Sequence, residues 1–320
     1  MRQSTVDSAM VVGPFSFFSP CRLRARVLLP SEFAGGSVRP LVLNNPLSRN
    51  CNLSQKDNPM INRRNFLAAA GAAGLAMHGQ SAMQAANTIG ERTVYELRQV
   101  HIGSEEQKQG LDAYLREAAI PALNRIGIKP VGEISPCEES RPVYVLLPHA
   151  SLESVVASTQ KLLADNEYLK KGADFLNAPA EQPAFQRMES SLLLAFKGMP
   201  KVETPIRSPE RIFQLRIYES PSVKTGQKKI EMFNDAGEIT IFRRVGLHPV
   251  FFGEAIVGSK LPNLTYMLVF ESEEQRKANW KKFGGDPDWQ RLRGMEEYSD
   301  KAILSGIINL PLKPAEYSQI

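Results

Sequence analysis

Hydrophobic and polar residues change their spacing several times in the middle of the chain, and each change marks an element. Residues 93–101 alternate with the period of two that is typical of a strand. Ser104 and Gln107 form a capping box, and Gly127 stands where a helix would end. Apolar residues at helical spacing lie between these signals, at Leu111, Leu115, Ala118, Ala122 and Ile126. The pattern predicts a strand and then a helix, in which Pro121 should cause a kink or a break.

The following segments complete a unit that occurs twice. Strands are expected at 128–135 and 142–148, a helical stretch at 151–177 and a strand at 188–196. The same order returns at 211–219, 222–245, 247–257, 263–271, 273–296 and 302–310. Three prolines in the connector 197–210 indicate a spacer between the two units.

Short landmarks support a duplication. Four of them recur in the same order and at nearly constant spacing: Tyr-Glu-Leu-Arg at 95–98 with Phe-Gln-Leu-Arg at 213–216, Gly-Ile-Lys-Pro-Val at 127–131 with Gly-Leu-His-Pro-Val at 246–250, Gly-Glu at 132–133 and 253–254, and Tyr-Val-Leu-Leu at 144–147 with Tyr-Met-Leu-Val at 266–269. Such agreement predicts two similar domains, 93–196 and 211–312, joined by the linker 197–210.

The order of elements in each unit is β-α-β-β-α-β, which is that of the ferredoxin-like fold. In this fold an antiparallel sheet carries its helices on one face, so the other face needs a cover. Two units in one chain can cover each other. We therefore predict an α+β protein with two tandem ferredoxin-like domains packed sheet to sheet.

The positive charge is concentrated in residues 1–86. The formal net charge is +5, but beyond residue 86 the basic and acidic residues nearly balance. The part expected to fold therefore gives no reason to expect a nucleic-acid partner. Of the three cysteines only Cys137 lies there, so neither an intramolecular disulfide nor a cysteine-based metal site is expected.

Residues 60–86 have the features of an export signal. Arg63 and Arg64, followed by x-Phe-Leu, resemble the twin-arginine signal, and the apolar run 66–77 is too short to span a bilayer. We expect a periplasmic or secreted protein with no stable membrane span after leader cleavage; the alternative is a buried, alanine-rich helix. Met60 is interpreted as the true start of translation, so residues 1–59 would be upstream sequence included through a wrongly assigned start. The alternative is a genuine disordered extension.

The second half carries further motifs, and with them the chain resembles the NIPSNAP family over about 93–310. They are Gly-Leu-His-Pro-Val-Phe-Phe-Gly-Glu at 246–254 and Asp-Pro-Asp-Trp at 286–289, followed by Arg291 and Arg293. The resemblance implies a dimeric α/β-barrel, a superfold that also hosts small monooxygenases. The first half has Asp-Asn-Glu-Tyr at 165–168 in place of Asp-Pro-Asp-Trp, so any site built on that motif is expected only once.

Two arginines in matching places of the first strands are the main candidates for a ligand pocket. If Leu97 and Leu215 face the helices, Arg98 and Arg216 point into the space between the sheets, together with Glu96, Gln214 and Tyr218. A buried guanidinium needs a carboxylate, and Glu133 and Glu254 are the expected partners. The arginines would form either an internal salt-bridge lattice or an anion-recognising pocket.

Histidines and aromatic residues are weaker candidates. His248 corresponds to Lys129 and could act as a general base, or it could be an ordinary residue at a strand edge. His101 and His149 have no histidine counterparts and lack metal-ligand spacing, so no metal is expected. Core packing is the favoured interpretation of the aromatic residues Trp280, Phe283, Trp289 and Tyr298.

These patterns leave the activity open. We expect a protein without a cofactor that binds a small organic or anionic ligand or a protein partner, and that could form a homo-oligomer. The pocket candidates are Arg98, Arg216, Tyr218, His248 and Glu254. The alternative is a cofactor-independent monooxygenase or isomerase, with substrate between sheet and helices; a haem peroxidase is less favoured. An apolar cavity around one titratable residue would favour the enzyme, and a filled interior would favour binding or structure.

Overall fold

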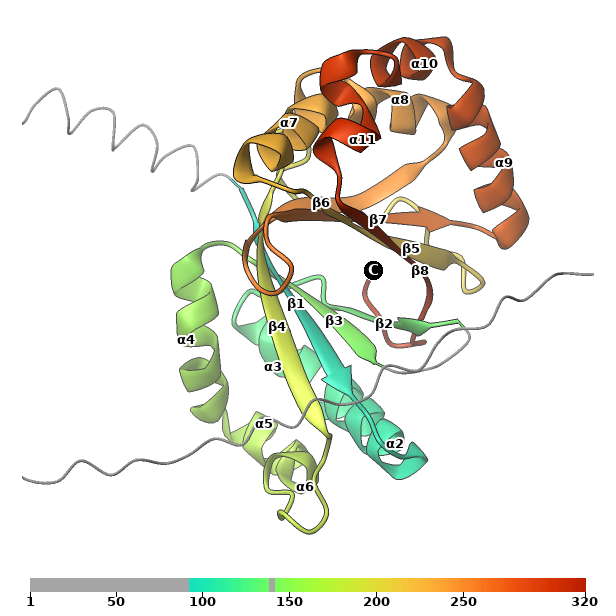
Figure 1. The fold of residues 1–320 in the computed structure, drawn as a ribbon. Helices are drawn as coiled ribbons and strands as arrows, with labels where there is room; N and C mark the ends of the chain where they lie inside the picture. Colours follow the sequence, from blue (N-terminus) through green and yellow to red (C-terminus); the bar gives the residue numbers. More distant parts are fainter. Residues whose placement is uncertain (1–91, 138–141) are drawn as a thin grey trace, which may run out of the picture. The chain divides into compact units, whose positions relative to one another are not determined.

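The computed structural model describes residues 92–137 and 142–320 (Figure 1). The chain divides into two units, Met1–Met60 and Ile61–Ile320, and every described residue belongs to the second. The expected extension 1–59 and leader 60–86 lie outside the described residues. Among the described helices, none combines the length and the apolarity that crossing a bilayer would demand.

The first half contains the expected succession of strands and helices. Its elements are β1 (Val94–His101), α2 (Glu105–Tyr114), the π-helical turn η1 (Leu115–Ala119), α3 (Ile120–Arg125), β2 (Gly132–Pro136), β3 (Val143–His149), α4 (Leu152–Leu163), α5 (Asn166–Lys171), α6 (Ala173–Leu176) and β4 (Arg187–Ala195). Ser104 begins α2 as predicted, because its side chain accepts a hydrogen bond from the backbone N–H of Gln107.

The second half repeats this succession. Its elements are β5 (Ile212–Glu219), α7 (Val223–Asn234), α8 (Glu238–Val245), β6 (His248–Val257), β7 (Asn263–Phe270), α9 (Glu273–Gly285), α10 (Pro287–Arg293), the 3₁₀ turn η2 (Glu296–Tyr298), α11 (Asp300–Ile303) and β8 (Gly306–Pro314). Gly127 and Gly246 both follow a helix with a left-handed backbone, at φ of 87° and 85°, so both predicted helix ends are confirmed.

The α-helix is interrupted just before Pro121, the residue at which a kink or a break is expected. The chain runs from α2 through the π-helical turn η1 into α3, and Pro121 lies in the first turn of α3. The backbone N–H of Ile120 donates to the carbonyl of Leu115, five residues back. This wider turn lies where a proline, which has no N–H, would otherwise interrupt the hydrogen-bond ladder.

The eight strands close into one antiparallel barrel in the order β1-β3-β2-β8-β5-β7-β6-β4. The two halves join at two edges, where β2 pairs with β8 and β4 pairs with β6. The expected packing of two separate sheets face to face is therefore corrected, because the open edges of each half are satisfied by hydrogen bonds to the other. The helices of each half lie on the outside of the barrel (Figure 1).

Side chains divide into three cores: the barrel interior and one helix-covered layer in each half. The interior is filled by residues such as Tyr95, Leu97, Leu215 and Phe251. The prediction that Leu97 and Leu215 face the helices is wrong. Strands of a helix-covered barrel are buried on both faces, so alternation alone could not tell the inside from the outside.

The fourth landmark of the repeat, 144–147 with 266–269, is offset by one residue in the structure. Arg98 lies opposite Val145 across the β1–β3 ladder, and Arg216 lies opposite Tyr266 across β5–β7. Tyr266 therefore corresponds to Val145 rather than to Tyr144. A shift of one residue exchanges the faces of a strand, and indeed Tyr144 belongs to the barrel interior whereas Tyr266 packs under the helices.

Candidate functional site

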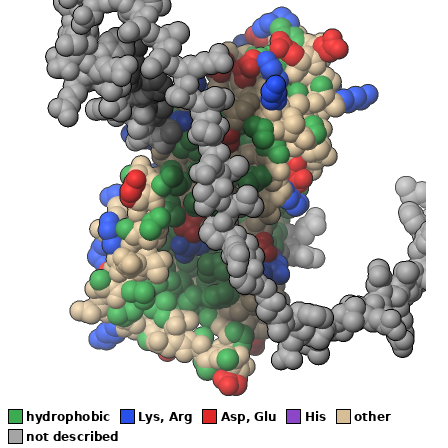
Figure 2. All heavy atoms as spheres, turned by 60° about the vertical axis from the view of Figure 1, so that its left-hand side comes forward, with side chains coloured by type: hydrophobic (Ala, Val, Ile, Leu, Met, Phe, Trp, Pro, Cys, Tyr) green, Lys and Arg blue, Asp and Glu red, His purple; other side chains and the backbone are tan. Residues whose placement is uncertain are grey.

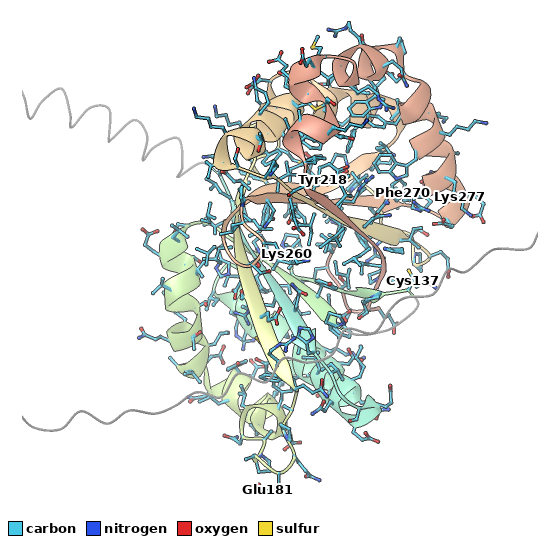
Figure 3. The ribbon with its side chains drawn as sticks, viewed as in Figure 1. Cys137, Glu181, Tyr218, Lys260, Phe270 and Lys277 are labelled. Atoms are coloured by element: carbon cyan, nitrogen blue, oxygen red, sulfur yellow. The ribbon has the colours of Figure 1, made fainter. Side chains whose placement is uncertain are left out.

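The five predicted pocket residues do not form one pocket. Arg98 lies on the helix-covered face of the first half, and Arg216 lies on that of the second half with Tyr218 (Figure 3). Glu254, near the end of β6, accepts a hydrogen bond from Gln227. His248, half-buried at the start of β6, makes no side-chain hydrogen bond or ion pair within the described part of the chain.

Arg98 is held by the neighbouring carboxylate of its own strand. Its Nε and Nη2 donate to Glu96 at 2.8 and 2.9 Å, and Ser190 donates to the same carboxylate at 2.8 Å. Burial alone would raise the pKa of Glu96, but the nearby His149 and hydrogen bonds from Arg98 and Ser190 lower it to about 2. Glu96 is therefore ionised, and it neutralises the charge of Arg98.

His149 completes this cluster, although sequence reasoning had set it aside. Its side chain is fully buried, with Nε2 at 3.4 Å from Glu96 and Nδ1 at 3.1 Å from Ser154 Oγ. The strand period places His149 two residues beyond Leu147, on the same face of β3. The sequence alone does not show which face of β3 lies under the helices, and so it does not place His149 beside Glu96.

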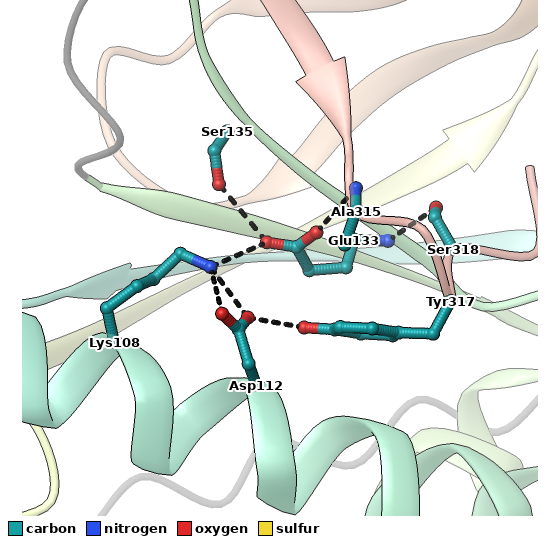
Figure 4. Close-up of polar contacts among 7 residues, drawn as sticks. All are labelled: Lys108, Asp112, Glu133, Ser135, Ala315, Tyr317 and Ser318. Carbon is teal, nitrogen blue, oxygen red and sulfur yellow. Dashed lines mark hydrogen bonds and ion pairs between the residues drawn. The ribbon is translucent and has the colours of Figure 1, made fainter. Parts of the chain in front are cut away.

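Glu133 lies elsewhere and is not the partner of an arginine (Figure 4). It is buried on β2, where its carboxylate accepts hydrogen bonds from Ser135 and from the backbone N–H of Ala315. Lys108 Nζ lies 3.9 Å from it and 2.6 Å from Asp112. The expected pairs of Arg98 with Glu133 and of Arg216 with Glu254 are therefore wrong. Strand β3 separates Glu133 from Arg98, because both residues lie level with Val145. Glu254 lies level with Tyr218 rather than with Arg216.

A small hollow next to Arg98 shares two of its lining residues with a surface groove. The hollow, of about 50 Å³, lies between the sheet and the helices and is lined by Arg98, Tyr114, Phe175, Met188 and eight apolar residues. The groove, of about 650 Å³, is lined by α2, α6 and residues 178–184. Tyr114 and Phe175 line both spaces. The two spaces therefore border one aromatic pair. Figure 2 shows apolar side chains on the face of the first half that it turns forward.

Two aromatic contacts fix that boundary. The rings of Tyr114 and Phe175 stack with centroids 4.0 Å apart, and Phe185 extends the stack at 5.8 Å. The hydroxyl of Tyr114 hydrogen-bonds to that of Tyr168 at 2.7 Å. Burial raises the pKa of Tyr114, so it presents a neutral phenol to the hollow.

Gly110 forms part of the groove wall and is a signal that sequence reasoning missed. It lies inside α2, and a Cβ added there would meet nothing within 4 Å. Glycine inside a helix costs about 1 kcal/mol relative to alanine. No steric conflict explains its presence, and a glycine at this position keeps the groove open.

The equivalent layer of the second half is filled instead. Arg216 lies over the rings of Tyr218 and Trp280, and Gln214 receives a hydrogen bond from Trp280 Nε1 at 2.6 Å. The expected core packing of the aromatic residues is confirmed: Phe283 and Tyr298 are buried, and Trp280 and Trp289 pack against the same core. Burial raises the pKa of Tyr218 to about 12 despite nearby Arg216, so it too is a neutral phenol.

The Asp-Pro-Asp-Trp motif is a helix cap rather than a site. Asp286 accepts hydrogen bonds from two backbone N–H groups at the start of α10 and forms an ion pair with Arg244 at 2.8 Å. In the first half Asp165 caps α5 in the same way and pairs with Arg125 at 2.6 Å. The first half departs from the motif in sequence, but the capping aspartate and its paired arginine are present in both halves.

Other types of site were sought in the same residues. Within residues 92–137 and 142–320, no three His, Cys, Asp or Glu side chains come together in a way that could hold a metal ion. The barrel interior offers Tyr95 as a polar group, and its hydroxyl is buried without a hydrogen-bond partner there. The groove and hollow of the first half therefore remain the best candidate site.

Comparisons with known proteins support one family. Residues 213–319 match the family model NIPSNAP, which confirms for that segment the resemblance seen in the sequence. No curated protein matches the chain.

Solved structures with low sequence identity resemble parts of the fold. A proposed monooxygenase from Lactobacillus acidophilus NCFM has 9% identity and a TM-score of 0.48, covering 70% of this chain and 94% of its own. A NIPSNAP-like domain protein from Burkholderia xenovorans has 20% identity and a TM-score of 0.30, covering 34% and 89%. A NIPSNAP family protein from Agrobacterium tumefaciens has the same identity and TM-score, covering 34% and 96%.

Proposed function

The chain belongs to the NIPSNAP family through residues 213–319, and from this premise we propose that it binds a small, neutral organic ligand in the groove of its first half. The observation that carries the proposal is the groove of about 650 Å³ that shares Tyr114 and Phe175 with the Arg98 hollow. Its volume lies in the range of small-molecule pockets, and aromatic walls are typical of them.

The charge balance determines the class of ligand. Arg98 is bound in a bidentate pair to ionised Glu96, so the cluster has no excess positive charge for an anion. A neutral acceptor, such as a carbonyl or hydroxyl oxygen, can still approach the partly exposed guanidinium. We therefore propose an aromatic or apolar body in the groove, with a polar head toward Arg98. This replaces the anion-recognising pocket expected there.

Binding is favoured over catalysis by the groups that line the hollow. Its two polar side chains are Arg98, whose guanidinium offers donors and no acceptor, and Tyr114, whose raised pKa keeps it neutral. Neither is suited to remove a proton from a substrate near neutral pH. A cofactor-independent monooxygenase would need a base in the hollow, and the lining carboxylates, Glu106, Glu117 and Asp174, belong to the groove instead.

Mass spectrometry of small molecules released from the purified protein tests the proposal. We expect an uncharged aromatic or apolar compound at near-stoichiometric amount. Recovery of a compound that turns over with oxygen consumption would instead support the monooxygenase. Recovery of no compound, together with no binding from a library of neutral aromatic compounds, would contradict both.

We also propose that the barrel consists of two ferredoxin-like modules in tandem. The proposal is supported by the matching order of strands, β4-β1-β3-β2 in one half and β8-β5-β7-β6 in the other. Separate expression of residues 92–196 and 211–320, followed by mixing, tests it. Recovery of a stoichiometric complex of two folded halves would support the proposal, and halves that stay unfolded after mixing would count against it.

Export by the twin-arginine route is a further part of the proposal. It rests on Arg63 and Arg64 ahead of a mild apolar run. Replacing both by lysine should retain the protein in the cytoplasm, whereas the same change at Arg22 and Arg24 should not. Cell fractionation measures the outcome, and equal export of both variants would refute this route.

A further inference from the structure

A second cavity, of about 1160 Å³, shares no lining residue with the groove of the first half. Its walls come from three segments distant in sequence: Lys129 and Pro130 before β2, the connector between Val202 and Arg211, and the C-terminal segment 314–320. The chain ends near β8 and β2, where Ile320 packs into the barrel interior (Figure 1). The fold therefore brings these segments together around one space.

The C-terminal wall of this cavity is firmly attached to the barrel. The backbone N–H of Gln319 donates to Val131 at 2.9 Å, and the N–H of Val131 donates to Gln319 Oε1 at 2.8 Å. Ile320 is buried within the interior core, directly against Gly132, where a Cβ would collide with it. The cavity is thus bounded by fixed segments rather than by a loosely attached tail.

Its lining is cationic. The lining residues include three cationic side chains and one acidic side chain. The cations are Lys129, Arg207 and Arg211, and the acidic side chain is that of Glu316. Within the described part of the chain, neither Lys129 nor Arg207 forms an ion pair with an Asp or Glu side chain. Arg207 donates to the neutral hydroxyl of Thr204 at 3.0 Å.

Arg211 is held by main-chain oxygens. Its Nη1 donates to the carbonyl of Ser208 at 2.9 Å, and its Nε, at 3.0 Å, and its Nη2 both donate to an oxygen of Ile320, the last residue of the chain. Burial, and next the nearby positive charge of Arg207, lower the pKa of Arg211. The two guanidinium groups therefore repel each other across the cavity wall, and an anion between them would relieve this repulsion.

We propose that this cavity binds a small molecule that carries a phosphate or pyrophosphate group. Arginine and lysine together suit phosphate oxygens, because guanidinium groups offer parallel N–H donors and the ammonium adds a point charge. The site differs from the groove in its charge, so it would take a different class of ligand. It does not depend on the ligand proposed for the groove.

Isothermal titration calorimetry of the full-length protein with inorganic pyrophosphate at low ionic strength tests this inference. Binding is expected, and it should weaken as salt is added. Lys129→Gln and Arg207→Gln, which change exposed side chains, should each weaken binding by about threefold to tenfold. Arg291→Gln, a change at a similarly exposed arginine outside the cavity, should bind like the wild type.

Further results of these binding experiments would overturn or support the proposed phosphate site. Absence of pyrophosphate binding to the wild type, or an equal loss in Arg291→Gln, would overturn the proposal. Because Arg211 also anchors Ile320, Arg211→Lys keeps the charge and should retain most of the binding. Adsorption to phosphatidylglycerol vesicles without any binding of pyrophosphate would point to a membrane surface and would also overturn it.

Discussion

Arg98 and Arg216 occupy equivalent positions in the two halves of the barrel but have different partners. Arg98 lies opposite Ser190 on the neighbouring strand, and Arg216 lies opposite Asn309 at the matching place. Two residues earlier, the first half has Glu96 and the second half has Gln214. One arginine is therefore neutralised by a carboxylate, while the other is not.

The second arginine is accommodated by aromatic rings. Its guanidinium carbon lies 4.7 Å from the ring centroid of Trp280 and 5.2 Å from that of Tyr218, and its buried Nε has no acceptor among the described residues. In the second half, aromatic rings fill the layer between the sheet and the helices next to the arginine. In the first half, the hollow lies at the corresponding place. The duplicated fold thus combines one open layer with one packed layer.

Glu96→Gln should destabilise the protein by about 2 to 4 kcal/mol, because Arg98 and His149 would lose their charged partner. Chemical denaturation of the variant and the wild type measures the difference. Gln214→Glu is the converse change and should cost less, since the new carboxylate lies next to unpaired Arg216. A smaller loss in Glu96→Gln than in Gln214→Glu would contradict the assigned roles.

The stability that Glu96 contributes should depend on pH. Its pKa falls from an ordinary 4.5 to about 2 in the folded protein, so between these values the unfolded chain binds the proton and the folded chain does not. The contribution, on the order of 3 kcal/mol, is complete above pH 4.5 and is lost as the pH falls toward 2. The difference in unfolding free energy between wild type and Glu96→Gln should therefore be smaller at pH 3 than at pH 6.

Glu181→Gln provides the control for this pH dependence, because Glu181 is exposed at the far end of the first half (Figure 3). This variant should follow the wild type at both pH values. If Glu96→Gln shows the same deficit at pH 3 and pH 6, the carboxylate does not titrate as described.

Gly110→Ala should stabilise the protein by about 0.5 to 1 kcal/mol, because the methyl group improves helix propensity and meets open space. Gly127→Ala should instead destabilise it by about 1 kcal/mol or more, since Gly127 has φ of 87°. Thermal denaturation compares the two substitutions. A loss of stability in Gly110→Ala would mean that α2 does not have the described exposure.

Lys108→Met should destabilise the protein by about 1 to 3 kcal/mol, because Asp112 and Glu133 share its ammonium group (Figure 4). Burial raises the pKa of Glu133, and Lys108 opposes this rise. Without Lys108 the carboxyl groups should protonate more readily in the folded state, so the deficit should shrink as the pH is lowered. Unfolding at pH 5 and pH 7 measures this trend.

Lys277→Met is the matched control for Lys108→Met. Lys277, like Lys108, pairs with a carboxylate four residues away, but it is largely exposed (Figure 3). Its loss should cost less than about 0.5 kcal/mol at either pH. Equal costs for the two lysines would show that the Lys108 cluster is no more than a surface pair.

The sequence predicted the elements well and the site only in part. The capping serine at 104, the helix-ending glycines and the order of strands were all visible, because each depends on local chemistry. Which strand face lies inside the barrel was not visible, because Leu97 and Leu215 are as apolar as the residues under the helices. The error about these two leucines carried over to Arg98, which lies under the helices and not between the sheets.

The groove itself depends on contacts between distant segments. Tyr114 and Phe175 are far apart in sequence, and no spacing rule relates them. Gly110 was the available local signal, since a glycine inside a predicted helix calls for a reason. The pairing of Glu96 with Arg98 was also accessible, because residues i and i+2 of a strand share a face.

Blocking the groove tests the central claim most directly. Gly110→Trp places an indole in the groove without a clash in the helix, and Gly285→Trp places one on the exposed end of α9 as the control. Native mass spectrometry of both variants and the wild type, each incubated with the neutral compound recovered from the wild type, measures occupancy. The account predicts loss of binding in Gly110→Trp alone, and full occupancy in that folded variant would contradict it.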